Sequence, residues 1–167
     1  MTNAGALMVT TPSDREILMT RLFDAPRRLV FDAFTKPELV QRWLLGPDGW
    51  SMPVCEIDLR VGGGYRYVWR KDQTGEQMTV TGTFREIVPP ERLVHTERFE
   101  DPWYPGEAVI TTVFEEQRGR TTMRQTMLLA SRDARDAVLK SGMETGVERS
   151  YQRLEEQLTG MAKVSAD

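Results

Sequence analysis

A long amphipathic helix near the C-terminus constrains this chain more than any other feature of its sequence. Between Asp133 and Met161, apolar residues recur at steps of four, four, four, three and four, on one stripe of a helix: Leu139, Met143, Val147, Tyr151, Leu154 and Leu158. Such a stripe needs an apolar surface to lie against. Because nearly everything between Glu16 and Ala130 has the pattern of strands, we predict that the helix lies across a curved sheet. The space between them is then the functional part of the molecule.

Two glycines, Gly142 and Gly146, interrupt this helical pattern one turn apart. Each costs a helix about 1 kcal/mol relative to alanine, so each needs a reason. Gly142 could divide the segment into a short helix, Arg132–Ser141, and a longer one, Met143–Leu158. The glycines could instead let the backbone approach a neighbouring strand, or leave room for a ligand beside Met143.

The rest of the chain predicts one antiparallel sheet with two short helices inserted after its first strand. The expected helices are Pro26–Phe34 and a second one between Thr35 and Gly46, both with an apolar period of 3.6 residues. The expected strands are Glu16–Phe23, Ser51–Leu59, Tyr65–Arg70, Gln77–Val88, Leu93–Phe99, Glu107–Glu116 and Thr121–Leu129. The order β-α-α-β6-α indicates an α+β fold and excludes a doubly wound α/β chain, in which strands and helices alternate throughout.

One predicted strand carries three aromatic residues on one face. Tyr65, Tyr67 and Trp69 alternate with other residues at a period of two. The apolar side chains of this face and of the helix stripe must be covered, either by each other or by a ligand. If they touch each other they form a core; if the sheet is strongly curved they cannot all touch, and an apolar cavity remains, which is the usual form of a small-molecule site. Methionines such as Met127 and Met143 would adapt such a site to varied shapes.

Polar candidates for chemistry are few. His95 and Glu97 share a parity on one strand, followed by Phe99. If that face is internal, Glu97 could accept a hydrogen bond or act as a base, and His95 could titrate near neutrality. If it is external, both are ordinary surface residues. Glu56 and Asp58 are an alternative acid–base pair, although strand surfaces often carry such pairs.

Composition excludes several classes of function. A net charge of −3 argues against nucleic acid as a general partner, because phosphate binding needs a basic face. No apolar run is long enough to span a membrane, and the first residues lack the pattern of a signal peptide. A single cysteine, Cys55, fits a reducing cytoplasm. With a single histidine as well, we expect no metal site and no cofactor.

Four blocks of sequence carry a resemblance to a known superfamily. They are Asp24–Trp43 (DAPRRLVFDAFTKPELVQRW), Asp58–Arg70 (DLRVGGGYRYVWR), Gly82–Asp101 (GTFREIVPPERLVHTERFED) and Gly142–Leu158 (GMETGVERSYQRLEEQL). In this order they resemble the Bet v 1/START-like (SRPBCC) superfamily, and within it the group named after the activator of Hsp90 ATPase. The resemblance spans about Arg15 to Gly160. We therefore expect one domain at 15–160, a flexible N-terminal arm at 1–14 and a flexible C-terminal tail at 161–167.

The resemblance implies a helix-grip fold, in which a curved antiparallel sheet wraps around the C-terminal helix and encloses an apolar cavity. It implies binding of a hydrophobic small molecule that is lipid-, sterol- or polyketide-like. The family usually has tryptophan where Val147 stands, and often an aromatic residue where Leu44 stands, so this cavity differs in shape. The candidate ligand-binding residues are Trp43, Tyr65, Tyr67, Trp69, Glu97, Phe99, Met127, Met143, Val147 and Tyr151.

Two other functions remain open at the level of sequence. An enzyme of the cyclase or hydrolase type would use Glu97 and His95. A protein-interaction domain, with a chaperone partner by family name, would need an exposed apolar patch, for which Trp103 and Tyr104 in the loop Glu100–Gly106 are the candidates. Sheet edges and this aromatic loop could also support a homodimer.

Overall fold

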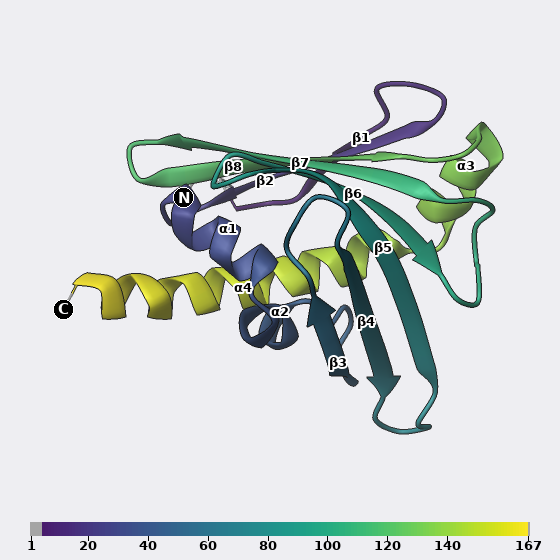
Figure 1. The fold of residues 1–167 in the computed structure, drawn as a ribbon, viewed down its shortest axis with the longest axis horizontal. Coiled ribbons are helices and arrows are strands. Elements are labelled where there is room, and N and C mark those ends of the chain that lie inside the picture. Colours follow the sequence, from purple (N-terminus) through teal and green to yellow (C-terminus); the bar gives the residue numbers. More distant parts are fainter. Residues whose placement is uncertain (1–4, 167) are drawn as a thin grey trace.

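The computed structural model describes residues 5–166 and forms one curved sheet with four helices on its concave side (Figure 1). Over these residues the elements are β1 (Met8–Thr10), β2 (Glu16–Phe23), α1 (Arg27–Thr35), α2 (Pro37–Trp43), β3 (Trp50–Ile57), β4 (Gly64–Lys71), β5 (Gln77–Val88), β6 (Arg92–Phe99), β7 (Ala108–Gln117), β8 (Arg120–Leu128), α3 (Arg132–Lys140) and α4 (Met143–Ala166). The predicted α+β helix-grip fold is confirmed.

All neighbouring strands of the sheet are antiparallel, in the order β1-β2-β8-β7-β6-β5-β4-β3. The strands β3 to β8 follow one another as hairpins, and β2 then joins the sheet beside β8. Register shifts lie between Ser51 and Val54 in β3 and between Phe84 and Glu86 in β5. Irregularities of this kind bend a strand and increase its twist. Figure 1 shows the result, with β3, β4 and β5 running steeply away from β7 and β8.

The second half of α4 lies in the main hydrophobic core. Tyr151, Leu154 and Leu158 are 3%, 0% and 0% exposed, and they share one cluster with Phe23 of β2 and Trp43 of α2. The short helices α1 and α2 therefore close one end of the sheet over α4. The described helices include none that is both long enough and apolar enough to cross a membrane.

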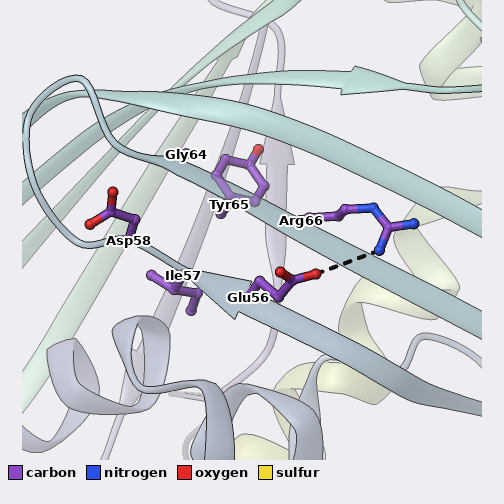
Figure 2. Close-up of a pocket in the computed structure, with 6 residues that line it drawn as sticks. All are labelled: Glu56, Ile57, Asp58, Gly64, Tyr65 and Arg66. Atoms are coloured by element: carbon purple, nitrogen blue, oxygen red, sulfur yellow. Dashed lines mark ion pairs between the residues drawn. The ribbon is translucent and has the colours of Figure 1, made fainter.

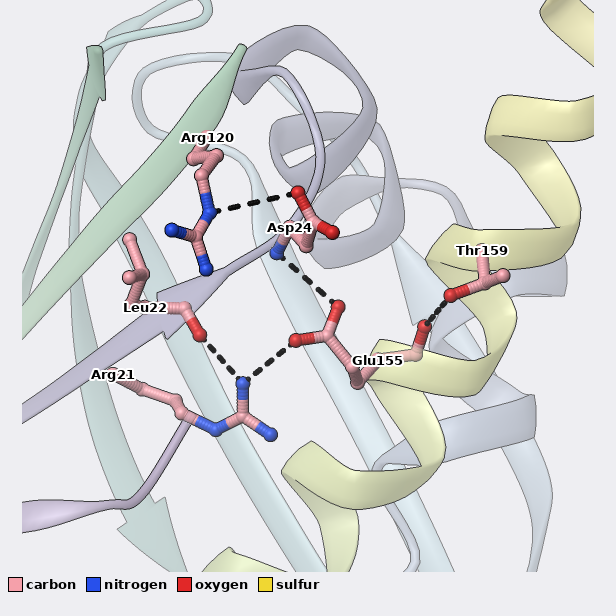
Figure 3. A network of polar contacts seen from close by, with 6 residues as sticks. All are labelled: Arg21, Leu22, Asp24, Arg120, Glu155 and Thr159. Atoms are coloured by element: carbon pink, nitrogen blue, oxygen red, sulfur yellow. Dashed lines mark hydrogen bonds and ion pairs between the residues drawn. The ribbon is translucent and has the colours of Figure 1, made fainter. Parts of the chain in front are cut away.

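An ion pair between a buried arginine and a half-buried glutamate ties α4 to β2. Arg21 of β2 is 6% exposed, and its guanidinium lies 3.0 Å from the Glu155 carboxylate (Figure 3). The same guanidinium donates to the Leu22 carbonyl, and the Asp24 amide donates to the other Glu155 oxygen. Breaking such a pair leaves a buried charge without a partner, which is strongly destabilising, so the pair fixes where α4 lies on β2.

The two glycines of the helical segment have separate structural causes. Gly142 has φ +78°, a left-handed conformation that ends the segment containing α3 before α4 begins. Gly146 lies inside α4, where a β-carbon would stand 3.1 Å from the Pro47 side chain. The close approach is thus to the loop after α2 rather than to a strand.

Regular structure occurs within the segments that the sequence predicts to be a flexible arm and a flexible tail. Met8–Thr10 pairs with β2 as an edge strand, and α4 continues over 161–166. Met161 and Ala162 pack against the main core, which gives the helix a reason to continue past Gly160. The remaining parts of the predicted arm and tail, residues 1–4 and 167, lie outside the described residues.

Candidate functional site

The aromatic residues of β4 form a continuous row on the inner face of the sheet, the face that α4 covers farther along. The Tyr65 and Tyr67 ring centroids are 4.9 Å apart, and those of Tyr67 and Trp69 are 5.9 Å apart. Their cluster also contains Val80 and Phe84 of β5 and is separate from the cluster that holds the buried residues of α4. Tyr65 is 5% exposed, whereas Tyr67 and Trp69 are half-buried. The helix therefore does not cover this row.

Tyr65 is fixed by a contact that the sequence pattern does not show. Its hydroxyl donates to the Thr96 carbonyl at 2.6 Å. The ring crosses Gly82, its partner on β5, where a β-carbon would overlap both the Thr96 carbonyl oxygen and the ring. Glycine at this position therefore allows the close approach. Only the strand register identifies Gly82 as part of the site.

Trp69 and the loop after α2 close one side of the row. The Trp69 indole donates to the Leu44 carbonyl at 2.7 Å. Two residues later in the chain, the Gly46 amide donates to the Ser150 hydroxyl of α4 at 2.8 Å, and the Gly46 carbonyl accepts from Arg153 at 2.7 Å. The loop is therefore joined to β4 on one side and to α4 on the other, and it bridges the space between them.

His95 and Glu97 both point to the inner face. The His95 ring is 5.1 Å from that of Tyr65, and its Nδ1 lies 3.2 Å from the Tyr65 hydroxyl oxygen. The Tyr104 hydroxyl donates to the Glu97 carboxylate at 2.9 Å. Of the two orientations that the sequence allows, the structure thus has the internal one.

Burial favours the neutral form of both groups. It raises the pKa of Glu97, against the opposing effect of the hydrogen bond from Tyr104. It lowers the pKa of His95, against the opposing hydrogen bond to the Thr96 carbonyl. Burial likewise raises the pKa of the half-buried Cys55 thiol to about 12, and the Glu38 charge adds to the effect. Cys55 pairs with Tyr67 across β3 and β4, so a poorly reactive thiol lies at the edge of the same row.

The ten predicted ligand-binding residues divide into two groups. Four are core residues, at 2–5% exposed: Trp43, Tyr65, Met127 and Tyr151. The Trp43 indole, for example, donates to the Ala33 carbonyl at 2.9 Å and lies within the main core. Six are half-buried: Tyr67, Trp69, Glu97, Phe99, Met143 and Val147. Together, these six keep accessible surface on the inner side of the molecule, and we call them the half-open set.

Two shallow hollows lie at the rim of the sheet. The first, of about 460 Å³, is lined by Glu56, Ile57, Asp58, Gly64, Tyr65 and Arg66 (Figure 2). The second, of about 260 Å³, lies between β5, β6 and the loop Glu100–Gly106. No residue of α4 lines either hollow. The alternative acid–base pair belongs to the first one, where Glu56 pairs with Arg66 at 3.6 Å and Asp58 with Arg60 at 2.8 Å. These are exposed ion pairs, which contribute little and imply no chemistry.

The aromatic loop differs from its predicted role as an exposed patch. Tyr104 is 3% exposed and turned inward to Glu97, whereas Trp103 is 38% exposed. Tyr104 is therefore a member of the site that sequence reasoning missed, because residues in an irregular loop have no period that would show their direction. Among the described residues, no three His, Cys, Asp or Glu side chains are grouped to hold a metal ion.

A curved sheet, a helix across part of it and a half-open apolar inner face define a ligand-binding domain of the Bet v 1-like helix-grip class. The pattern of the family described as "Activator of Hsp90 ATPase homolog 1-like protein" matches residues 24–159, so the chain belongs to this family.

Solved structures of similar proteins support the same fold. A protein of Rhodobacter sphaeroides is 30% identical, with a TM-score of 0.87, and the match covers 92% of this chain and 98% of that one. A protein of Chromobacterium violaceum is 26% identical, with a TM-score of 0.77 and coverage of 87% and 98%. An AHSA1-like protein of Aeromonas hydrophila is 19% identical, with a TM-score of 0.67 and coverage of 84% and 93%, which supports the fold alone. No protein with curated function matches the chain.

Proposed function

We propose that this protein binds a hydrophobic small molecule, lipid-, sterol- or polyketide-like, between α4 and the strands β4 to β6. One observation carries the proposal. The inner-facing side chains Tyr67, Trp69 and Phe99 are half-buried, whereas residues of α4 farther along are fully buried against the other half of the sheet. An inner face that the protein's own helix leaves partly uncovered is a surface for something else to cover.

The first turns of α4 provide the opposite wall. Met143 and Val147 are half-buried and pack, like Phe99, against the cluster that joins residues of β2, β7, β8 and α3 with Tyr104. An apolar ligand seated there is stabilised by about 25 cal/mol for each Å² of apolar surface removed from water, without any catalytic residue. Met143 is flexible and polarisable, which suits ligands of varied shape.

Val147 gives a direct test, because the resembling family usually has tryptophan at this position. Val147→Trp is expected to fill the space that we propose for the ligand and to abolish ligand binding, while the melting temperature of the free protein stays the same or rises. The matched control is Leu139→Trp, which adds the same bulk at a residue of α3 that is 39% exposed.

The measurement is native mass spectrometry of protein purified from its own host, followed by thermal denaturation with the extracted compound. Wild-type protein and Leu139→Trp should retain the compound and be stabilised by it, by about 2.7 kcal/mol at a hundredfold excess over Kd. Retention of the compound by Val147→Trp would place the site elsewhere and contradict the proposal.

An enzyme of the cyclase or hydrolase type is a second candidate, favoured by the inward direction of His95 and Glu97. The His95 and Glu97 side chains contact tyrosine hydroxyls, at 3.2 Å and 2.9 Å. Because burial favours the neutral form of both groups, Glu97 can donate a proton and His95 can accept one. Incubating the extracted compound with fresh protein and following its mass and connectivity tests this role. An unchanged compound after prolonged incubation would leave binding as the function.

A further inference from the structure

Glu97 carries a half-buried carboxyl group without a cationic partner. Its single hydrogen bond within the described part of the chain comes from the Tyr104 hydroxyl, at 2.9 Å, and no ion pair there includes it. The buried cation on the inner side of the sheet is Arg21, which lies on β2 and is already paired with Glu155 at 3.0 Å. An ionised carboxylate in apolar surroundings is costly unless a positive charge lies beside it.

The groups that face Glu97 supply no such charge. Tyr65 and Tyr67 face it from β4 and Tyr104 from the loop after β6, and burial, with a further contribution from Glu97, raises the pKa of Tyr65 and Tyr104. Burial is also the main cause that raises the pKa of Tyr67, with smaller contributions from Cys55 and Glu97. His95, on the same strand, has a lowered pKa. Met143 and Val147 of α4, which pack against the same cluster as Phe99, carry no charge.

Aromatic rings are grouped beside Glu97, on β4, β6 and the loop after β6. Phe99, two residues along β6, stacks with Trp69 at 6.5 Å, and its ring centroid lies 5.5 Å from that of Trp103 and 5.9 Å from that of Tyr104. Trp69 and Phe99 belong to the half-open set, so their surfaces are accessible. Aromatic faces attract cations, most strongly where water is excluded. An anion site would instead need Lys, Arg or backbone amide donors.

We propose that Glu97 and the rings of Trp69, Phe99 and Tyr104 form a cation-recognition site, and that the ligand is a hydrophobic molecule carrying a quaternary ammonium or protonated amine. This inference rests on the proposed binding function and specifies the polar end of its ligand. The apolar part of the ligand then lies along Tyr67, Met143 and Val147. Its positively charged end forms an ion pair with the Glu97 carboxylate.

Binding of a cation changes the protonation of Glu97 in a defined direction. In the free protein burial favours the protonated carboxyl. When a quaternary ammonium binds, the carboxyl proton passes to water and the carboxylate remains against the cation. Affinity for the cation should therefore fall as pH decreases through the pKa of Glu97, whereas affinity for a neutral ligand should not follow this dependence.

The test uses three probes of equal chain length below their micellar concentrations: decyltrimethylammonium, decanol and decanoate. Isothermal titration calorimetry of wild-type protein should show decyltrimethylammonium binding about tenfold or more tightly than decanol, with decanoate weakest. Glu97→Gln keeps the shape and the acceptor for Tyr104, and the ratio of cation to decanol affinity should then fall to about one. Glu144→Gln, which removes one negative charge from the exposed face of α4, should leave the ratio as in wild type.

The possible outcomes distinguish failure of the cation site from failure of the proposed hydrophobic binding. Equal affinity of the wild type for the three probes, or an unchanged ratio in Glu97→Gln, overturns the cation site while hydrophobic binding stands. Binding of none of the probes by folded wild-type protein overturns both. Wild-type affinities at about pH 8 and pH 5 give an independent readout that needs no variant, and a pH-independent affinity for decyltrimethylammonium also overturns the cation site.

Discussion

At the scale of single residues, Glu97 and His95 affect stability in opposite directions as pH changes. The folded protein raises the pKa of Glu97, so it binds that proton more tightly than the unfolded chain does. Stability from this group is present below the ordinary pKa of about 4.3 and is lost as pH rises through the folded value. The pKa of His95 is lowered, so its contribution is lost as pH falls from about 6.5 toward the folded value.

Glu97→Gln should therefore melt at a higher temperature than the wild type at about pH 8, where ionising the wild-type carboxyl in an apolar site is costly. The difference should shrink toward about pH 4, where both side chains are neutral. Thermal denaturation of both proteins across this range measures it, with Glu144→Gln as the control for loss of a surface charge. If the gain in melting temperature of Glu97→Gln stayed constant over the whole pH range, the pKa of Glu97 would not be raised in the folded protein.

The sequence predicted the direction of a side chain correctly where residues of one kind repeat with a regular period along a strand. The alternation of Tyr65, Tyr67 and Trp69 places three rings on one face, and the structure has them there. The shared parity of His95 and Glu97 correctly places them together, but parity alone does not say which face is internal. Tyr104 and Gly82 were missed, because one lies in a loop without a period and the other is recognised only through its cross-strand partner.

At the scale of elements, the break between α3 and α4 depends on one residue. Gly142 has φ +78°, and a β-carbon added there would meet nothing within 4 Å, so its conformation rather than crowding requires glycine. Gly142→Ala should destabilise the protein by about 1–2 kcal/mol, the cost of a left-handed conformation for an L-residue.

Gly160 is the matched control, a glycine inside α4 with no atom near its β-carbon position and an ordinary helical φ. Gly160→Ala should stabilise the protein by about 0.5–1 kcal/mol. Chemical denaturation of the two variants measures both changes. Equal effects of the two substitutions would show that α3 and α4 can form one continuous helix.

The elements themselves were largely predictable, since periodic segments define them. The predicted strands from Glu16–Phe23 to Thr121–Leu129 agree with β2 to β8 to within two residues at each end. The strand β1 was missed because a segment of three residues has no measurable period and is held by backbone pairing with β2. The final turns of α4 were missed because Gly160 resembles a helix end in sequence, whereas packing of Met161 and Ala162 maintains the helix.

At the scale of the whole molecule, the buried residues of α4 share a core with β2, β7 and β8 (the filled half), whereas the aromatic row of β4 belongs to a separate cluster (the open half). Along α4, burial increases from the half-buried Met143 and Val147 to the fully buried Leu154 and Leu158. The filled half contains β2, β8 and β7, which follow the edge strand β1, and the open half contains β4, next to the edge strand β3 at the other end. Sequence gives the apolar stripe of the helix, but not how far the sheet bends away from it.

This division predicts the pattern of amide hydrogen exchange. Amides exchange through local openings, whose free energy depends on the buried contacts around them. Amides of β2, β8 and the α4 segment Tyr151–Leu158 should exchange about tenfold or more slowly than those of β4 and the first turns of α4. Val147→Trp, which adds bulk between α4 and the sheet, should slow exchange in β4 and around Met143. Mass-spectrometric exchange on intact chains followed by peptic digestion measures both, and protection of β4 equal to that of β8 in the wild-type protein would show that the open half is already packed.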